Sequence, residues 1–166
     1  YPLSIVLVPL VWATGSAGRR HGRSYPHLID LCVVAPFLLD TAGNAATLYD
    51  TVSWWDDVMH VATWLPLVIA FGLALQSRPR SRVDVAVMTV GFGAVTHVLW
   101  EVAEYVTFVQ GNATEAAGAY RDTIGDLLAS LAGSTIGAVL VTTVLWGRGQ
   151  RATAYPPSAT SSWPVT

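Results

Sequence analysis

The sequence lacks lysine and carries little charge of either sign. Its 166 residues hold nine arginines, eleven aspartates and glutamates and no lysine, so that only 12% of them are charged. Soluble domains carry about 25% charged residues. A formal net charge of −2 also leaves no basic surface for nucleic acid. Composition therefore excludes an ordinary soluble domain and argues against a nucleic-acid-binding protein.

Cysteine is nearly absent as well. Cys32 is the only one in the chain, which excludes both a disulfide framework and a cysteine-based zinc site. The sequence also contains no Gly-rich phosphate loop, nucleophile elbow, HExxH motif or Ser–His–Asp signature. Catalysis by a nucleophilic triad is therefore disfavoured.

Long apolar stretches dominate the chain instead. Hydrophobic residues make up 52% of it, and its mean hydropathy is +0.46. A membrane-spanning helix needs ~20 mostly apolar residues. The sequence therefore predicts an all-α fold, a polytopic transmembrane helical bundle with no β-sheet. The expected complete spans are residues 28–49, 55–76, 83–110 and 122–146.

The two ends of the chain differ from this pattern. Residues 2–14 are apolar but too short to span, and they follow Tyr1 without an initiator methionine. We interpret them as the truncated first of about five spans, because a signal peptide would show a charged start and a small-residue cleavage site. Residues 1–146 then form one transmembrane domain. Residues 147–166, rich in Ser, Thr, Ala and Pro, are predicted to be a disordered cytoplasmic tail.

The arginines predict the orientation of the bundle. Eight of the nine lie in the segments that follow residues 14, 76 and 146, and only Arg121 lies in a segment of the opposite parity. Cytoplasmic loops are enriched in Lys and Arg. The C-terminus is therefore expected in the cytoplasm, and the ends of the spans near residues 45, 55, 105 and 122 are expected at the extracytoplasmic face.

A set of acidic and other polar side chains occurs inside or at the edge of the apolar stretches, toward that extracytoplasmic face. A charged side chain at the bilayer centre costs roughly 2.5–3.5 kcal/mol or more, so such residues usually have a partner or a function. Each of the four spans contributes two or three of them, three or four positions apart, which places them on one helix face. They are Asp40 and Asn44; Asp56 and His60; His97, Glu101 and Glu104; and Asp122 and Asp126.

Inward-facing ligands from four helices are typical of metal sites in helical bundles. Carboxylates with one or two imidazoles suit a divalent ion such as Mg²⁺, Mn²⁺, Zn²⁺, Ca²⁺ or Fe²⁺. Glu104 is the candidate general base of the site. The predicted metal ligands are Asp56, His60, Glu101, Asp122 and Asp126, with Asp40, Asn44 and His97 as possible additions.

Three alternatives to a metal site apply to some of these residues. Acidic side chains near a helix N-terminus complement the helix dipole, which suits Asp56 and Asp122. The dipole does not account for Glu101 and Glu104, which lie near the C-terminal end of their span. Ion pairing with arginine has Arg121 as its only candidate on that side. Protons shared between carboxyl groups stay open as an alternative to a metal ion.

Small residues recur every four positions along the last span, at Gly125, Ala129, Gly133 and Gly137. Such stripes let the backbones of membrane helices approach closely. We therefore expect this span to pack tightly against a neighbour, which would hold Asp122 and Asp126 close to that helix.

Three ordered motifs carry a resemblance to a known family. They are D-x-x-x-H at residues 56–60, E-x-x-E at residues 101–104 and D-x-x-x-D at residues 122–126. In these motifs the chain resembles the YjdF-like family of bacterial multi-pass inner-membrane proteins, over residues 40–137. The resemblance implies a membrane bundle with a polar cluster and implies no activity. Asp40, Asn44 and His97 lie outside the family pattern.

The first functional hypothesis is a metal-dependent hydrolase of a lipid or lipid-linked substrate in the inner (cell) membrane, with membrane lipids as its partners. A divalent ion near the outer interface would activate water or bind a phosphate. The alternatives are a cation- or proton-coupled transporter or channel, and a non-catalytic membrane subunit with a structural metal site. Transport needs polar groups in the cytoplasmic half, where the last two complete spans offer few besides Asp84, Thr89 and two threonines near residue 142.

Overall fold

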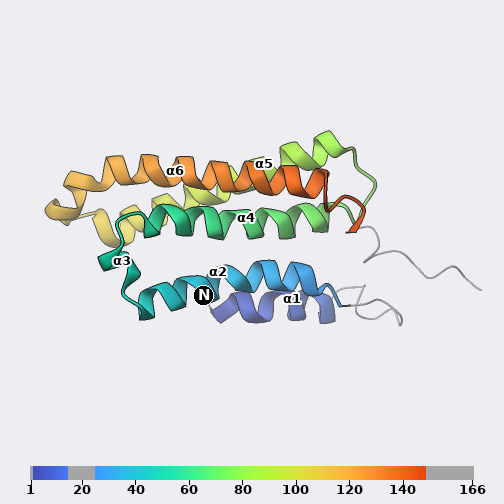
Figure 1. Cartoon of the computed structure of the whole chain (residues 1–166), viewed down its shortest axis with the longest axis horizontal. Helices are drawn as coiled ribbons and strands as arrows, with labels where there is room; N and C mark the ends of the chain where they lie inside the picture. The colour runs from blue at the N-terminus through green and yellow to red at the C-terminus, as the bar shows by residue number, and fades with distance from the viewer. Residues whose placement is uncertain (1, 15–24, 149–166) are drawn as a thin grey trace, which may run out of the picture.

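The computed structural model describes residues 2–14 and 25–148. Within these ranges every regular element is a helix, as the sequence predicts. α4, α5 and α6 pack together, and α2 packs against α4 with α1 at its side (Figure 1). The helices are α1 (Pro2–Thr14), α2 (His27–Ala45), α3 (Leu48–Thr51), α4 (Trp55–Leu75), α5 (Arg82–Glu104), the π-helix η1 (Tyr105–Val109) and α6 (Ala113–Thr142).

Four helical segments are long and apolar enough to cross a membrane: His27–Ala45, Trp55–Leu75, Arg82–Thr107 and Ala116–Thr142. The 21 residues of α4 extend about 31 Å at 1.5 Å per residue, close to the hydrocarbon thickness of ~30 Å. α1 has 13 residues and reaches only about 20 Å. The four complete spans are thus confirmed as helices, and a fifth crossing stays a prediction.

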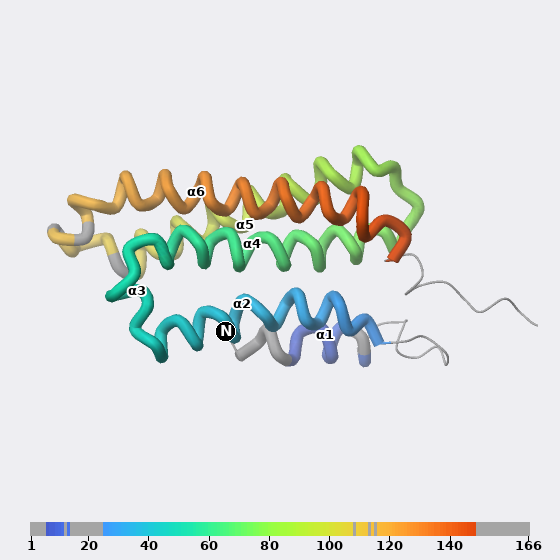
Figure 2. The backbone as a smooth tube through the Cα atoms, viewed as in Figure 1, coloured from blue at the N-terminus to red at the C-terminus, as the bar shows by residue number. Residues whose placement is uncertain are grey.

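The long helices alternate in direction, which gathers the predicted polar residues at one end of the bundle. In Figures 1 and 2 the end of α2, the start of α4, the end of α5 and the start of α6 lie at the same side, next to α3. This arrangement agrees with the alternating spans expected from the sequence. Whether that end faces away from the cytoplasm stays a prediction.

The outer surface of the bundle is apolar, and its tightest packing lies between α4, α5 and α6. Leu99 and Leu128 are more than 60% exposed, which suits a surface in contact with lipid. Val68, Val85 and Val141 are fully buried. One valine comes from each of the three helices, so the core of this part of the protein is the seam where the three meet.

Close approach of α6 to α4 confirms the expected role of the small-residue stripe. A Cβ atom added at Gly133 would lie 2.9 Å from the carbonyl oxygen of Val61, and one at Gly137 would lie 3.0 Å from the carbonyl oxygen of Leu65. These are backbone atoms of α4, which cannot move aside without moving the helix. Glycine is therefore needed at both positions for the two backbones to lie so close.

α6 begins earlier than the sequence predicts. The apolar pattern predicts a span that opens at Asp122, with the preceding residues in a loop, but the helix starts at Ala113 and Asp122 lies in its third turn. The connection is short because η1 continues α5 as far as Val109. Asp122 is therefore not at a helix N-terminus, and the helix dipole does not account for its position.

Two expectations concern segments outside the described residues. The arginine-rich connection predicted after α1 falls mainly on residues 15–24, and the predicted disordered tail falls mainly on residues 149–166. Within the described part, α6 ends at Thr142 and is followed by turns to Gly147.

Candidate metal centre

Asp56 and His60 lie in the first two turns of α4 and face α6. His60 is buried, and its Nε2 atom lies 3.3 Å from Oδ1 of Asp126 on α6 and 3.8 Å from Oδ1 of Asp56 one turn earlier on its own helix. The Asp126 side chain is 6% exposed, whereas that of Asp56 is 48% exposed. The three residues form a group that is buried on the α6 side and open toward the end of the bundle.

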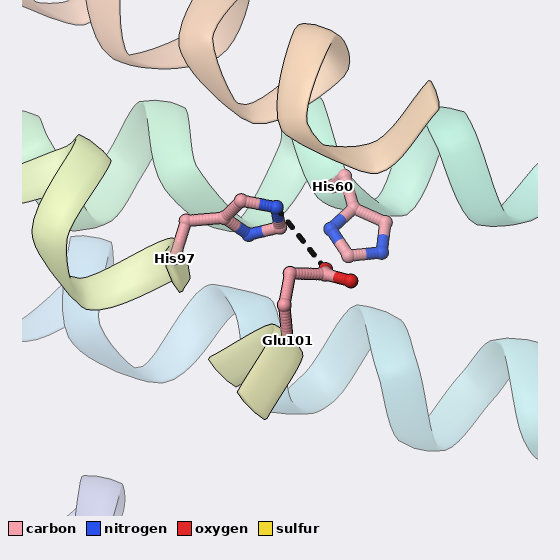
Figure 3. Close-up of side chains that lie close together, drawn as sticks. All are labelled: His60, His97 and Glu101. Atoms are coloured by element: carbon pink, nitrogen blue, oxygen red, sulfur yellow. Dashed lines mark ion pairs between the residues drawn. The ribbon is translucent and has the colours of Figure 1, made fainter. Parts of the chain in front are cut away.

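His97 and Glu101 form a second group on α5. Nε2 of His97 lies 3.1 Å from Oε1 of Glu101, and the two side chains are 2% and 11% exposed. Figure 3 shows the two side chains converging beside the His60 ring. Within the described ranges neither atom has a hydrogen-bond partner of acceptable geometry, although both are buried. An imidazole and a carboxylate at this distance without a hydrogen bond are arranged like two ligands directed at a common point.

Ser130 of α6 connects the two histidines. Its Oγ atom lies 3.1 Å from Nδ1 of His97 and 3.3 Å from Nδ1 of His60, and the side chain is buried. A serine hydroxyl has one proton and two lone pairs, so Oγ can accept N–H from both rings. In that arrangement both Nε2 atoms carry lone pairs, which is the form in which histidine binds a metal.

Ser130 is not among the site residues predicted from the sequence. Serine is common where membrane helices pack closely, so on its own it carries no signal for a site. Its position could nevertheless have predicted a place in the site. Ser130 follows Asp126 by four residues and therefore lies on the same face of α6.

The two histidine rings pack against each other, and a tryptophan packs against one of them. The ring of Trp64 meets His97 edge-on at 5.3 Å between centroids, and the rings of His60 and His97 meet at 5.1 Å. Trp64 is 6% exposed. Both contacts pack against the ring of His97, a residue that is itself 1% exposed, so the imidazole is held within the bundle and away from water.

Five side chains thus form two groups of three that share His60. In each group one ligand atom per residue lies within 4.8 Å of the others. Two ligand atoms bound at about 2.05 Å to a tetrahedral ion lie about 3.3 Å apart, and the 3.1 and 3.3 Å distances match this value. The groups are His60, His97 and Glu101, and Asp56, His60 and Asp126.

No arginine neutralises these carboxylates within the described ranges, where every ion pair has a histidine as its basic member. Arg121 is exposed. Pairing with arginine therefore fails as an account of the cluster in this part of the chain. A divalent cation or shared protons remain to offset three carboxylates in an apolar bundle.

Several residues predicted for the site lie outside the two groups. Asp122 is exposed on α6, one turn before Asp126.

Asp40 also lies outside the two groups. It accepts hydrogen bonds from Nδ2 of Asn44 at 3.2 Å and from the Tyr49 hydroxyl at 2.8 Å, so its carboxylate already has partners. Glu104 is half-buried in the last turn of α5, beyond Glu101. The structure therefore brings His97 into one of the two groups and leaves Asp122, Glu104, Asp40 and Asn44 outside them.

A narrow apolar cleft leads to the cluster from the outer surface between α5 and α6. Its volume is about 170 Å³, and His97 and Ser130 are its polar residues. Val98, Leu128 and Leu131 border it, and each of these is about half exposed or more. The cleft opens on the side of the bundle that suits lipid, away from the open end near Asp56.

Residues 2–147 match a protein family described as predicted membrane protein (DUF2238). The chain belongs to this family. The match confirms the expectation of a membrane protein from a family without an assigned activity, whereas the bacterial origin and the YjdF-like affiliation stay predictions. No curated protein and no solved structure matches the chain. Family membership therefore agrees with the four described helices that are long and apolar enough to cross a membrane.

Proposed function

We propose that this membrane protein binds a divalent metal ion between α4, α5 and α6. The observation that carries the proposal is the arrangement of His97 and Glu101: two buried ligand atoms, 3.1 Å apart, with no hydrogen-bond partner in the described part of the chain. A buried polar atom without a partner costs roughly 1–3 kcal/mol, and a bound cation would remove that cost from both atoms at once. His60, Asp126 and the half-exposed Asp56 supply the remaining ligands.

The ligand set favours some metals over others. Mg²⁺ and Ca²⁺ prefer oxygen ligands, whereas two imidazoles with carboxylates suit Zn²⁺, Fe²⁺ or Mn²⁺. His97 is the residue that shifts this balance, because it adds a second imidazole to a site that would otherwise have one. We propose Zn²⁺ as the first ion to test.

We further propose that the site hydrolyses a lipid or lipid-linked substrate. The cleft between α5 and α6 favours a substrate with an apolar portion, because Val98, Leu128 and Leu131 line the cleft next to His97. A divalent ion in such a site polarises a phosphoryl or carbonyl oxygen and makes water more acidic. Glu104, one turn beyond Glu101, is our candidate for the group that takes a proton from the attacking water.

A second candidate function has an observation of its own. Beyond the cluster, three polar side chains are almost fully buried in the other half of the bundle: Ser134, Thr89 and Gln76. The hydroxyl oxygens of Ser134 and Thr89 have no hydrogen-bond partner in the described structure. Acidic residues and buried polar groups mark ion pathways in membrane proteins. Cation or proton transport through this line of residues is therefore the runner-up proposal.

Metal content is the first test. The detergent-purified protein should retain close to one equivalent of metal per chain after exposure to Zn²⁺ and dialysis. The Glu101→Ala variant should lose most of this metal. Asp122→Asn serves as the control, because Asp122 is exposed and outside both groups. Loss of metal in Asp122→Asn but not in Glu101→Ala, or no bound metal in any preparation, would contradict the assignment.

Activity tests then separate the two functions. The zinc-loaded protein should release a soluble headgroup or fatty acid from phospholipid vesicles, and Glu104→Gln should lower the rate without lowering metal content. In proteoliposomes, zinc or proton flux that depends on Ser134 and Thr89 would favour transport instead. Bound metal with neither turnover nor flux would leave the structural metal site as the function.

A further inference from the structure

A second polar site lies at the other end of α4, where this helix turns into α5. A cavity of about 270 Å³ opens there, about 25 Å along the helix axis from His60 at 1.5 Å per residue. It is lined by Phe71, Ala74, Leu75, Ser77, Arg78 and Arg80. The cavity shares no residue with the metal cluster, so a ligand bound in it is independent of the proposed function.

The two arginines of this cavity have no protein partner among the described residues. In that part of the chain neither the Arg78 nor the Arg80 side chain makes a hydrogen bond or an ion pair, and the Nε atom of Arg80 is buried without an acceptor. A guanidinium carries five N–H donors and stays charged at every relevant pH. A buried donor left without an acceptor is costly, so this atom calls for a ligand.

Arg82, at the same end of the bundle, has protein partners and serves as a comparison. Its Nη1 atom donates to the carbonyl oxygen of Thr142 at 3.2 Å, and its guanidinium lies 5.1 Å from the centre of the Trp146 ring. Arg82 thus stabilises the end of α6. Within the described helices and turns, Arg78 and Arg80 bind no such carbonyl, which argues against a capping role for them.

The acidic residue closest to them in the sequence, Asp84, is engaged elsewhere. Its Oδ2 accepts from the backbone N–H of Ser81, while its own N–H donates to the Ser81 hydroxyl. This capping box commits Asp84 to the start of α5. As far as the chain is described, the cavity therefore carries an unneutralised positive charge.

The other wall of the cavity is apolar. Phe71 stacks on Phe92 of α5, with ring centroids 4.2 Å apart and planes 10° apart, and Ala74 and Leu75 continue the surface toward the arginines. A volume of about 270 Å³ is slightly smaller than that of the pockets that take drug-sized ligands. This size suits a headgroup, with a chain lying along Phe71.

We propose that this cavity binds the phosphate of an anionic phospholipid through Arg78, Arg80 and the Ser77 hydroxyl. Arginine binds phosphate through two parallel N–H bonds, and basic pockets at the ends of membrane helices bind anionic headgroups. Free phosphate offers the same charge but leaves the apolar wall without a function. The lipid would hold the α4–α5 connection at the membrane surface, at the end of the bundle where Arg82 and Arg148 also lie.

The test measures lipid binding to the full chain in detergent by native mass spectrometry, with phosphatidylglycerol as the anionic probe and phosphatidylcholine as the zwitterionic one. The double variant Arg78→Gln/Arg80→Gln should bind phosphatidylglycerol at least tenfold more weakly. Arg148→Gln should bind it like the wild type, because Arg148 is exposed at the same end but does not line the cavity. Ala74→Trp, which fills the cavity without changing charge, should also weaken binding.

Several results would overturn the proposal. Unchanged phosphatidylglycerol binding in the double variant would show that the arginines do not form the site. An equal loss in Arg148→Gln would show general attraction by positive charge. Inorganic phosphate that competes as tightly as the lipid would show a site for free anions. Melting temperatures of all variants, measured in the same detergent, identify any variant that has simply unfolded.

Discussion

Replacing Ser130 by alanine should weaken metal binding without removing any metal ligand. The substitution deletes one buried hydroxyl whose oxygen lies 3.1 Å from Nδ1 of His97 and 3.3 Å from Nδ1 of His60. Serine and alanine differ by a single heavy atom, so the packing of α6 is retained. What changes is the acceptor that favours the N–H on Nδ1 and leaves Nε2 free for the ion.

The expected loss can be worked out from the two contacts. Removal of an outer partner of a metal-binding histidine typically lowers metal affinity 10–100-fold. Ser130 contacts two such histidines, so at the lower limit of tenfold for each ring the affinity should fall about 100-fold. That is a free energy of about 2.7 kcal/mol, since each factor of ten corresponds to about 1.4 kcal/mol. A loss confined to one ring would give about tenfold.

The assay is a competition titration of the detergent-purified protein with Zn²⁺ against a chromophoric chelator. Ser134→Ala is the matched control, because Ser134 lies one turn further along α6 and is equally buried, but its hydroxyl has no hydrogen-bond partner in the described structure. Wild-type affinity in Ser130→Ala, combined with loss of binding in Glu101→Ala, would show that Ser130 only fills space. Equal losses in the two serine variants would show a packing effect.

Three further predictions address the ligands, the packing and the ion. Asp126→Asn should lower Zn²⁺ affinity at least tenfold while Asp122→Asn leaves it unchanged, measured by the same titration, because only the former lies in the cluster. Gly133→Ala should destabilise the protein by about 1–3 kcal/mol, because the added Cβ atom would meet the α4 backbone. Gly118→Ala is the control and should not destabilise it, because no atom lies within 4 Å of a Cβ atom added there. Thermal unfolding in detergent compares the two variants. Zinc at 100 times its dissociation constant should add about 2.7 kcal/mol of stability, and a chelator should remove it, as the melting temperature will show. A stabilised Gly133→Ala, or a melting temperature insensitive to zinc, would contradict the respective prediction.

Hydropathy and helical spacing are sufficient to predict the spans and most of the cluster. Apolar stretches of 20 residues have few alternatives to a membrane helix. The spacing of Asp56 and His60, and of His97 and Glu101, places each pair on one face of its helix. Alternation of the spans then brings the faces to the same end. These steps need only the period of the helix and the reversal of direction at each connection.

The structure departs from the prediction where position along a helix decides contact. Asp122 and Asp126 share a face, but four residues advance the chain by about 6 Å, roughly the length of a whole side chain. Asp126 therefore reaches His60, while Asp122 lies beyond it and is exposed. Helical periodicity identifies the face of a helix on which a residue lies. It does not give the height along the bundle at which that residue meets the neighbouring helix. That height depends on how the packed helices are rotated about their axes and shifted along them, which helical periodicity alone does not predict.

The small-residue stripe of α6 supplies that missing information in part. Gly133 and Gly137 set the backbone of α6 against that of α4, and Asp126 and Ser130 lie on the same helix, seven residues before each glycine in turn. Seven residues are nearly two helical turns, so Asp126 and Ser130 each lie on almost the same side of α6 as the glycine that follows. Close packing in one half of the seam therefore fixes how near Asp126 comes to His60 in the other. If this coupling holds, a larger side chain at Gly133 should weaken zinc binding as well as stability, even though Gly133 touches none of the ligands; stability lost with unchanged zinc affinity would show that the two halves of the seam act independently.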